Sequence, residues 1–286
     1  MRVALRRRQL SLQKSMRVLP AVLAAAAWFV ATSVHADSVT VAPTQDTSIF
    51  SGTSGSNSLA DGAGPYLWLS VTAEGLNRRA LLRFDVSAIP PGALVREVRL
   101  SLYESRSREN HAVQVHRLLR AWGEGGSNGG SAGAGALALP GDATWVNAVH
   151  PNQGWDAPGG DFAPAPSASI QVGFPGQFYT WGPTGGLSAD VQAWVDHPGS
   201  NHGWILIGNE QGNQNAKRFE SHDNTEASLR PRLEVVYDPP ALASDGDIPI
   251  PAWALLALTG AFGHRLWRGS VRSRRNSPPP KRPAAH

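Results

Sequence analysis

The sequence contains no cysteine among its 286 residues. This absence excludes disulfide bonds and thiolate metal sites, but it does not fix the compartment, because many exported bacterial β-proteins also lack cysteine. The sequence also has no nucleophile elbow, no His-Glu-x-x-His pattern and no phosphate-binding loop. Its nine histidines show no ligand spacing. The sequence therefore gives little support to a catalytic function.

Acidic residues are missing from residues 1–36, which carry six basic ones. Residues 239–286 hold seven basic and two acidic residues, so both ends of the chain are positive. Residues 37–238 hold 13 basic and 20 acidic residues, a net charge of −7. A basic chain would ordinarily suggest a nucleic-acid partner. Because the middle of this chain is acidic, we expect no nucleic-acid binding.

Residues 1–36 have the pattern of a secretory signal peptide. A basic start precedes the apolar run at 19–30, and the small residue Ala36 precedes the predicted cleavage point. Met16 is an alternative start, since 16–36 forms a complete signal by itself. A membrane anchor is the other interpretation, but the run is shorter than the ~20 residues that a span needs.

The C-terminal part carries a second hydrophobic segment. We expect a linker at 239–247, a sorting or transmembrane segment at 248–275, and a disordered basic tail at 276–286. The order of Ile-Pro-Ile-Pro-Ala-Trp, an apolar stretch and an arginine cluster resembles the C-terminal sorting signals of Gram-negative bacteria, the PEP-CTERM group and its relatives. The resemblance implies export, transient anchoring in the inner membrane and a sorting peptidase as partner. A permanent single span is the alternative.

Short alternations of apolar and polar residues predict many β-strands in the middle of the chain. Residues 79–103 read as strand, turn and strand, and they would place apolar side chains on one sheet face. One helix is expected at 187–195, with Ser188 as its N-cap. The long irregular stretch 122–167 divides into a glycine-rich first half, expected to be disordered, and an ordered second half. This pattern predicts an all-β sandwich with one short helix.

An ordered series of motifs runs through residues 37–238. It includes RALLRFDVSAIP at 79–90, AWGEG at 121–125, GWDAPGGD at 154–161 and RFES at 218–221. The series resembles the DNRLRE-domain proteins and is similar to carbohydrate-binding module family 96. The resemblance implies a jelly-roll β-sandwich, secretion and polysaccharide binding.

Sugar binding needs flat aromatic faces and planar polar groups. The candidate residues are Trp145, Trp155, Asp156 and Asp161 in the long stretch. If the polysaccharide is acidic, arginines would pair with its carboxylates, and the candidates are Arg78, Arg79, Arg83 and Arg218. The alternatives are that the tryptophans fix the loop to the sandwich and that the arginines have glutamate partners on a solvated sheet face.

Calcium binding is a second possibility for the loops. The candidate ligands are Asp46, Asn57, Asp61 and Asp85, because calcium prefers carboxylate and carbonyl oxygens. Their spacing matches no calcium-loop motif, and aspartate and asparagine also cap turns without a metal.

The sequence favours an exported, non-catalytic polysaccharide-binding protein of a Gram-negative envelope. A structural or adhesive protein of the extracellular matrix is the alternative from another class. A polysaccharide lyase or hydrolase is the least favoured of the three.

Overall fold

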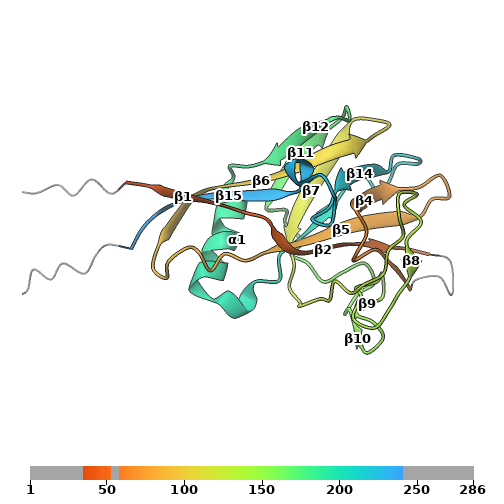
Figure 1. Ribbon diagram of the computed structural model, residues 1–286, viewed down its shortest axis with the longest axis horizontal. Helices are drawn as coiled ribbons and strands as arrows, with labels where there is room; N and C mark the ends of the chain where they lie inside the picture. The colour runs from red at the N-terminus through yellow and green to blue at the C-terminus, as the bar shows by residue number, and fades with distance from the viewer. Residues whose placement is uncertain (1–34, 53–57, 241–286) are drawn as a thin grey trace, which may run out of the picture. The chain divides into compact units, whose positions relative to one another are not determined.

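The computed structural model describes residues 35–52 and 58–240, and strands predominate in it (Figure 1). The predicted signal peptide, apart from residues 35 and 36, lies outside the described residues, as do the predicted sorting segment and basic tail. The strands are β1 (Asp37–Val41), β2 (Pro43–Phe50), β3 (Leu59–Ala60), β4 (Tyr66–Val71), β5 (Asn77–Phe84), β6 (Leu94–Arg106), β7 (His111–Arg117), β8 (Ala136–Leu137), β9 (Asn147–Val149), β10 (Gln153–Gly154), β11 (Ala168–Val172), β12 (Gln177–Trp181), β13 (Trp204–Ile207), β14 (Lys217–Glu220) and β15 (Arg232–Asp238). The helices are α1 (Gly185–Asp196) and the short 3-10 turns η1 (Pro198–Ser200) and η2 (Ala227–Leu229).

Thirteen of the described strands form one antiparallel sheet that turns over into two layers, and β9 and β10 pair separately. The first layer has the order β1-β15-β6-β14-β4, with β12 on the other edge of β6. The second layer has the order β5-β13-β7-β11, with β2 on the outer edge of β5 and β3 and β8 beyond it. The prediction of an all-β sandwich with one short helix is confirmed.

The two layers join at Ser70 in β4. Leu69 still pairs with β14 in the first layer, whereas Val71 already pairs with Asn77 of β5 in the second. Ser70 has φ of 74°, a left-handed conformation that costs a residue with a side chain about 1–2 kcal/mol. Its hydroxyl lies 2.9 Å from Nε2 of His111, and this contact helps to hold the bend.

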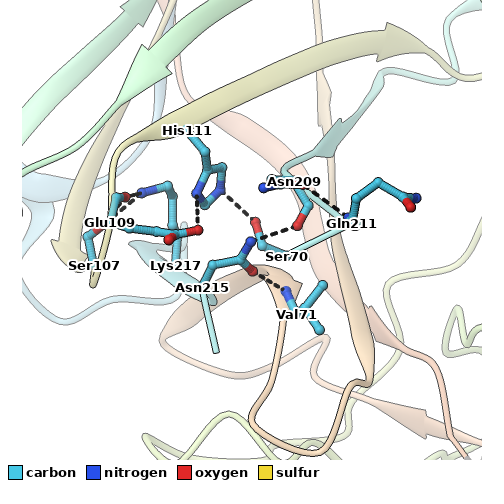
Figure 2. A network of polar contacts seen from close by, with 9 residues as sticks. All are labelled: Ser70, Val71, Ser107, Glu109, His111, Asn209, Gln211, Asn215 and Lys217. Carbon is cyan, nitrogen blue, oxygen red and sulfur yellow. Dashed lines mark hydrogen bonds and ion pairs between the residues drawn. The ribbon is translucent and has the colours of Figure 1, made fainter. Parts of the chain in front are cut away.

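Figure 2 shows the polar side chains around this bend. Asn215 accepts a hydrogen bond from the backbone N–H of Val71 at 2.9 Å and donates one to the carbonyl of Asn209 at 2.8 Å. On the other side of His111, the ammonium of Lys217 donates to Ser107 Oγ and to the carbonyl of Glu109. The bend is therefore fixed by side chains from β7, β14 and the segments beside them.

The main core lies between the layers. The period of two in β6 is confirmed, because Val98, Leu100 and Leu102 are all fully buried there. The largest side chains in this core are Trp181, Trp194, Trp204, Phe84 and Phe219. They come from both layers and from α1, so this core holds the sandwich together.

A second core covers the outer face of the second layer. Leu81, Ile205 and Ile207 point away from the first core and pack against Trp122 and Trp155 of the long irregular stretch. In Figure 1 this green stretch, with β9 and β10, lies beside β2. The stretch is thus a packed layer, as predicted for its second half.

The first half of the stretch is also fixed in place, so its predicted disorder is wrong. Its backbone N–H groups donate hydrogen bonds to carboxylates: Ser127 N–H donates to Asp142 at 3.3 Å, and Gly129 N–H donates to Asp61 at 2.6 Å. Further along, β8 pairs with β3. These contacts could not be predicted from composition, because disordered segments and tightly packed segments can both be rich in glycine.

Helix α1 begins two residues before the predicted start. Its N-cap is Thr184, whose hydroxyl accepts from the N–H of Leu187 at 3.2 Å, so the assignment of Ser188 as N-cap is wrong. The predicted buried face is confirmed, since Leu187, Val191 and Trp194 are buried. Within the described residues no helix has the length and apolar character to cross a membrane.

Candidate functional site

Three side chains form a row across the outer face of the first layer. Strand pairing places Trp68 of β4 opposite Arg218 of β14, and Arg218 opposite Arg106 of β6. A register shift at this point of β6 brings Arg106 onto the same face as Arg218. Two like charges directly opposite each other in a ladder are destabilising. An anion bound between the two guanidinium groups would reduce this repulsion.

Two more arginines lie beside this row. Arg78, Arg106 and Arg108 line a pocket of about 290 Å³ together with Trp68. Arg218 borders the pocket through its contact with Trp68, where its guanidinium carbon lies 5.9 Å from the ring centroid. We call these four arginines, with Tyr66 and Trp68, the arginine groove.

Few carboxylates lie near the positive charges of the arginine groove. Among the described residues, no carboxylate oxygen lies within 4 Å of the guanidinium groups of Arg78, Arg106, Arg108 or Arg218. The acidic residue in the pocket lining is the exposed Glu74. Positive charge in a groove of this kind attracts anionic ligands.

Burial makes one of these arginines unusual. The Nε of Arg78 is buried without a hydrogen-bond partner. Burial lowers the pKa of Arg78 to about 10, and Glu74 acts in the opposite direction. The guanidinium remains charged at neutral pH, so a partly desolvated cation faces the groove.

Aromatic rings support the other side of the groove. The guanidinium of Arg218 lies 4.1 Å from the centroid of the Tyr66 ring, and its Nε donates to Ser105 Oγ at 2.8 Å. Stacking and this hydrogen bond hold the guanidinium in one plane while its terminal nitrogens stay available. A planar, oriented guanidinium is suited to bidentate binding of a carboxylate. Arg218, predicted as a ligand residue, thus lies in the best-formed anion site of this face.

The tryptophans predicted to bind sugar lie in the second core. Trp155 is 7 % exposed, and its indole N–H donates to the carbonyl of Thr144 at 2.8 Å. Trp145 is half-buried, with the guanidinium of Arg79 at 4.8 Å from its ring centroid. Both rings fix the loop layer to the second layer, which was the alternative interpretation, and Trp155 presents no open ring face.

The predicted aspartates of this loop have partners of their own. Asp161 accepts from the backbone N–H groups of Asp156 and Ala157 and pairs with Arg120 Nε at 2.8 Å. Asp156 is exposed and also pairs with Arg120. These residues border a pocket of about 600 Å³, so Asp156 remains accessible, while Asp161 serves mainly to shape the loop.

Arg83 lies elsewhere, in a pocket of about 640 Å³ beside the end of α1. Its Nη1 donates to Gln45 Oε1 at 3.2 Å. The aromatic residues that line this pocket, Phe84 and Trp194, are fully buried in the main core. The pocket therefore offers a charge but no aromatic face, and the structure does not bring Arg83 together with Arg218.

The structure describes three of the four residues predicted to bind calcium, and it assigns Asp85 a role of its own. Asp85 is exposed and accepts from the N–H of Ser87 at 2.9 Å, as a turn residue does, and Asn57 lies outside the described residues. Asp46 and Asp61 are both buried. Burial raises the pKa of Asp61 to about 6 and raises that of Asp46 well above its usual value.

Asp46 instead meets residues from three distant segments. Its carboxylate Oδ2 accepts from the backbone N–H of His222 at 2.8 Å, and its own N–H donates to Glu124 Oε1 at 2.7 Å. The side chains of Asp46, Glu124, His222 and Asp223 each offer one ligand atom, and these atoms lie within 4.8 Å of one another. We call these four residues the carboxylate–histidine cluster.

The inner side of the first layer also carries buried charge. Glu104 and Lys217 are both fully buried, and neither carboxylate oxygen of Glu104 has a hydrogen-bond partner. Burial raises the pKa of Glu104 to about 7, although Lys217 lowers it. Burial also lowers the pKa of the neighbouring His111 to about 4.

Sequence reasoning missed Arg106, Arg108, Glu124, His222 and Asp223 as site residues. Strand register, including the shift in β6, decides that Arg106 faces Arg218, and no local motif encodes it. Glu124 and His222 did lie within or beside the motif segments AWGEG and RFES, and that was the available signal.

Comparison with known protein-family models finds no match, and comparison with curated proteins finds no significant relative.

Proposed function

We propose that this protein is an exported, non-catalytic binding protein for acidic polysaccharides, and that the arginine groove is its ligand site. The observation that carries the proposal is the pair of facing arginines, Arg218 and Arg106, on the outer face of the first layer. Arg218 and Arg106 are adjacent cations without carboxylate partners among the described residues. A polyuronate supplies carboxylates at regular intervals along a chain, which suits a row of guanidinium groups.

The motif series and the two predicted export signals support the same proposal. The series resembles a family of polysaccharide-binding modules, and signals at both ends of residues 37–238 would deliver such a module outside the cytoplasm.

Titration of the purified protein with sodium polygalacturonate and with neutral dextran tests the proposal. We expect binding to the polyuronate, weakened by salt because screening reduces the attraction between charges, and no binding to dextran. The double variant Arg106→Ala/Arg218→Ala should reduce affinity by about tenfold or more, since a hydrogen bond to a charged group contributes about 1.5–3 kcal/mol.

The matched control is Arg96→Ala. Arg96 is an exposed arginine of the same strand β6, but it is paired with Asp238. Arg96→Ala removes one of the two positive charges that the double variant removes and does not touch the groove, so its affinity should stay within about twofold of the unmodified protein. Equal losses in both variants would point to a general charge effect. Undiminished binding in the double variant would place the ligand elsewhere.

A further inference from the structure

The carboxylate–histidine cluster brings together residues from distant parts of the sequence. Asp46 belongs to β2 in the second layer, Glu124 begins the loop layer, and His222 and Asp223 follow β14 of the first layer. The hydrogen bonds that join them connect residues 78 and 176 positions apart in the sequence. The cluster is therefore the point at which both layers and the loop layer meet.

Two atoms of the cluster, Asp46 Oδ1 and His222 Nδ1, are buried without a hydrogen-bond partner. Asp46 is 1 % exposed, its Oδ2 is occupied by the His222 backbone, and its Oδ1 is buried without any hydrogen bond. A buried carboxylate oxygen left unsatisfied is costly, because it has lost its water without replacement. The ligand atom that Asp46 offers lies within 4.8 Å of those of Glu124, His222 and Asp223.

The spacing of the other atoms suits a small cation. His222 Nε2 lies 3.3 Å from Glu124 Oε1 and 3.3 Å from Asp223 Oδ2. A tetrahedral ion with bonds of about 2.0–2.2 Å would hold its ligand atoms about 3.3–3.6 Å apart. These two separations therefore match the edges of such a coordination shell.

The charge of the cluster also calls for a cation. Three carboxylates meet one imidazole, and no lysine or arginine nitrogen lies within 4 Å of them in the part of the chain that the structure describes. A divalent ion bound among them would offset two negative charges.

We propose that Asp46, Glu124, His222 and Asp223 bind one divalent transition-metal ion, zinc or manganese, that fastens the loop layer to the two layers of the sandwich. An imidazole among the ligands favours these ions over calcium or magnesium, which prefer oxygen alone. Asp223 is exposed and gives the ion a route from solvent. The ion has a structural role, and glycan binding at the arginine groove does not depend on its identity.

The test uses the full-length chain, stripped with EDTA and titrated separately with zinc, manganese and calcium chloride. We expect one equivalent of zinc or manganese to bind and calcium to bind more weakly. At a free ion concentration one hundred times the dissociation constant, Tm should rise by about 5–10 °C, because the ion binds the folded state alone.

The variants Asp46→Asn and Glu124→Gln keep the volume of the side chains and should weaken metal affinity at least about tenfold. The control is Asp85→Asn, an exposed aspartate of the same chain outside the cluster, which should leave affinity unchanged. The metal-free Asp46→Asn variant should melt at or above the metal-free unmodified protein, since its buried negative charge is gone. That result separates loss of the ligand from failure to fold.

Two outcomes would overturn the proposal. The first is the absence of binding of any of the three ions at one equivalent. The second is metal binding by Asp46→Asn and Glu124→Gln that equals that of the unmodified protein, which would place the ion elsewhere. Polyuronate titration of the EDTA-treated protein keeps this test separate from that of the proposed function.

Discussion

The two outer faces of the sandwich both carry an arginine stacked on aromatic rings, but the arginines are used differently. On the second layer, Arg79 lies over Trp145 and Phe162 and donates to both carboxylate oxygens of Glu210, at 2.7 and 2.8 Å. On the first layer, Arg218 lies over Tyr66, and among the described residues the one side chain that accepts a hydrogen bond from its guanidinium is Ser105.

This difference separates a structural arginine from a candidate binding one. Arg79 also donates to the carbonyl of Gly159, so its hydrogen-bonding groups hold the loop layer against the sheet. Among the described residues, no carboxylate pairs with Arg218 in this way. Stacking on an aromatic ring is therefore common to both faces, and the presence or absence of a protein carboxylate distinguishes them.

Among the variants that test this comparison, Trp155→Ala should have the largest effect on stability. If the loop layer is a true second core, removal of this buried ring should lower the free energy of unfolding by about 3–5 kcal/mol. Urea denaturation would measure the loss. Polyuronate affinity below the unfolding transition should be retained, because Trp155 does not line the pocket of the arginine groove. A loss below about 1 kcal/mol would show that the loop layer is only loosely attached.

The next test breaks the ion pair of the covered face. Glu210→Ala leaves Arg79 mostly buried without its carboxylate, and we expect a loss of about 3 kcal/mol of unfolding free energy. The matched change on the open face is Glu97→Ala, which removes the exposed partner of Arg99 and should cost below about 1 kcal/mol. Similar losses for both variants in urea denaturation would contradict the contrast between the faces.

Much of this two-layered fold is predictable from the sequence. The alternation of Val98, Leu100 and Leu102 with polar residues fixes one buried face of β6, and the helical spacing of Leu187, Val191 and Trp194 fixes the face of α1. Both patterns are local periodicities, and they can be recognised in the sequence wherever one face of a strand or helix is buried. The helix start was misjudged because two glycines, which have low helix propensity, occupy its first turn.

The covered face was not predictable in the same way. Gly125 has φ of 70°, and a β-carbon there would lie 1.6 Å from Asp142 Oδ1. A β-carbon on Gly133 would lie 2.7 Å from the ring of Trp68, so the glycine-rich stretch also packs against β4 of the first layer. These glycines are needed for close packing, but composition alone cannot separate that need from flexibility. The candidate sites also depend on long-range pairing, so Asp46 and Arg218 could be named from the sequence while most of their partners could not.

A smaller effect should sharpen the description of the open face. Tyr66→Ala removes the ring under Arg218 and should weaken polyuronate binding about fivefold, because an exposed cation–π contact contributes about 1 kcal/mol and keeps the guanidinium oriented. Tyr66→Phe retains the ring and should bind within about twofold of the unmodified protein. If Tyr66→Phe were as weak as Tyr66→Ala, the hydroxyl rather than the ring would be responsible.

The last test concerns charge on the inner side of the first layer, where the comparison of outer faces does not apply. Glu104 is buried, and its pKa is raised from 4.5 to about 7 in the folded protein. A carboxyl group with a raised pKa stabilises the fold below pH 4.5, and this contribution is lost as the pH rises through 7. Glu104→Gln stays neutral and does not undergo this loss. The stability of the variant relative to the unmodified protein should therefore increase between pH 5 and pH 8.

Urea denaturation midpoints of both proteins at pH 5, 6, 7 and 8 measure this difference. His111 acts in the opposite direction, since its pKa is lowered to about 4 and its contribution is lost as the pH falls from 6.5. Both proteins contain His111, so its effect largely cancels when they are compared. A difference in stability that is constant with pH would mean that Glu104 titrates alike in the folded and unfolded chains. In that case Lys217 would compensate fully for the burial of the carboxylate.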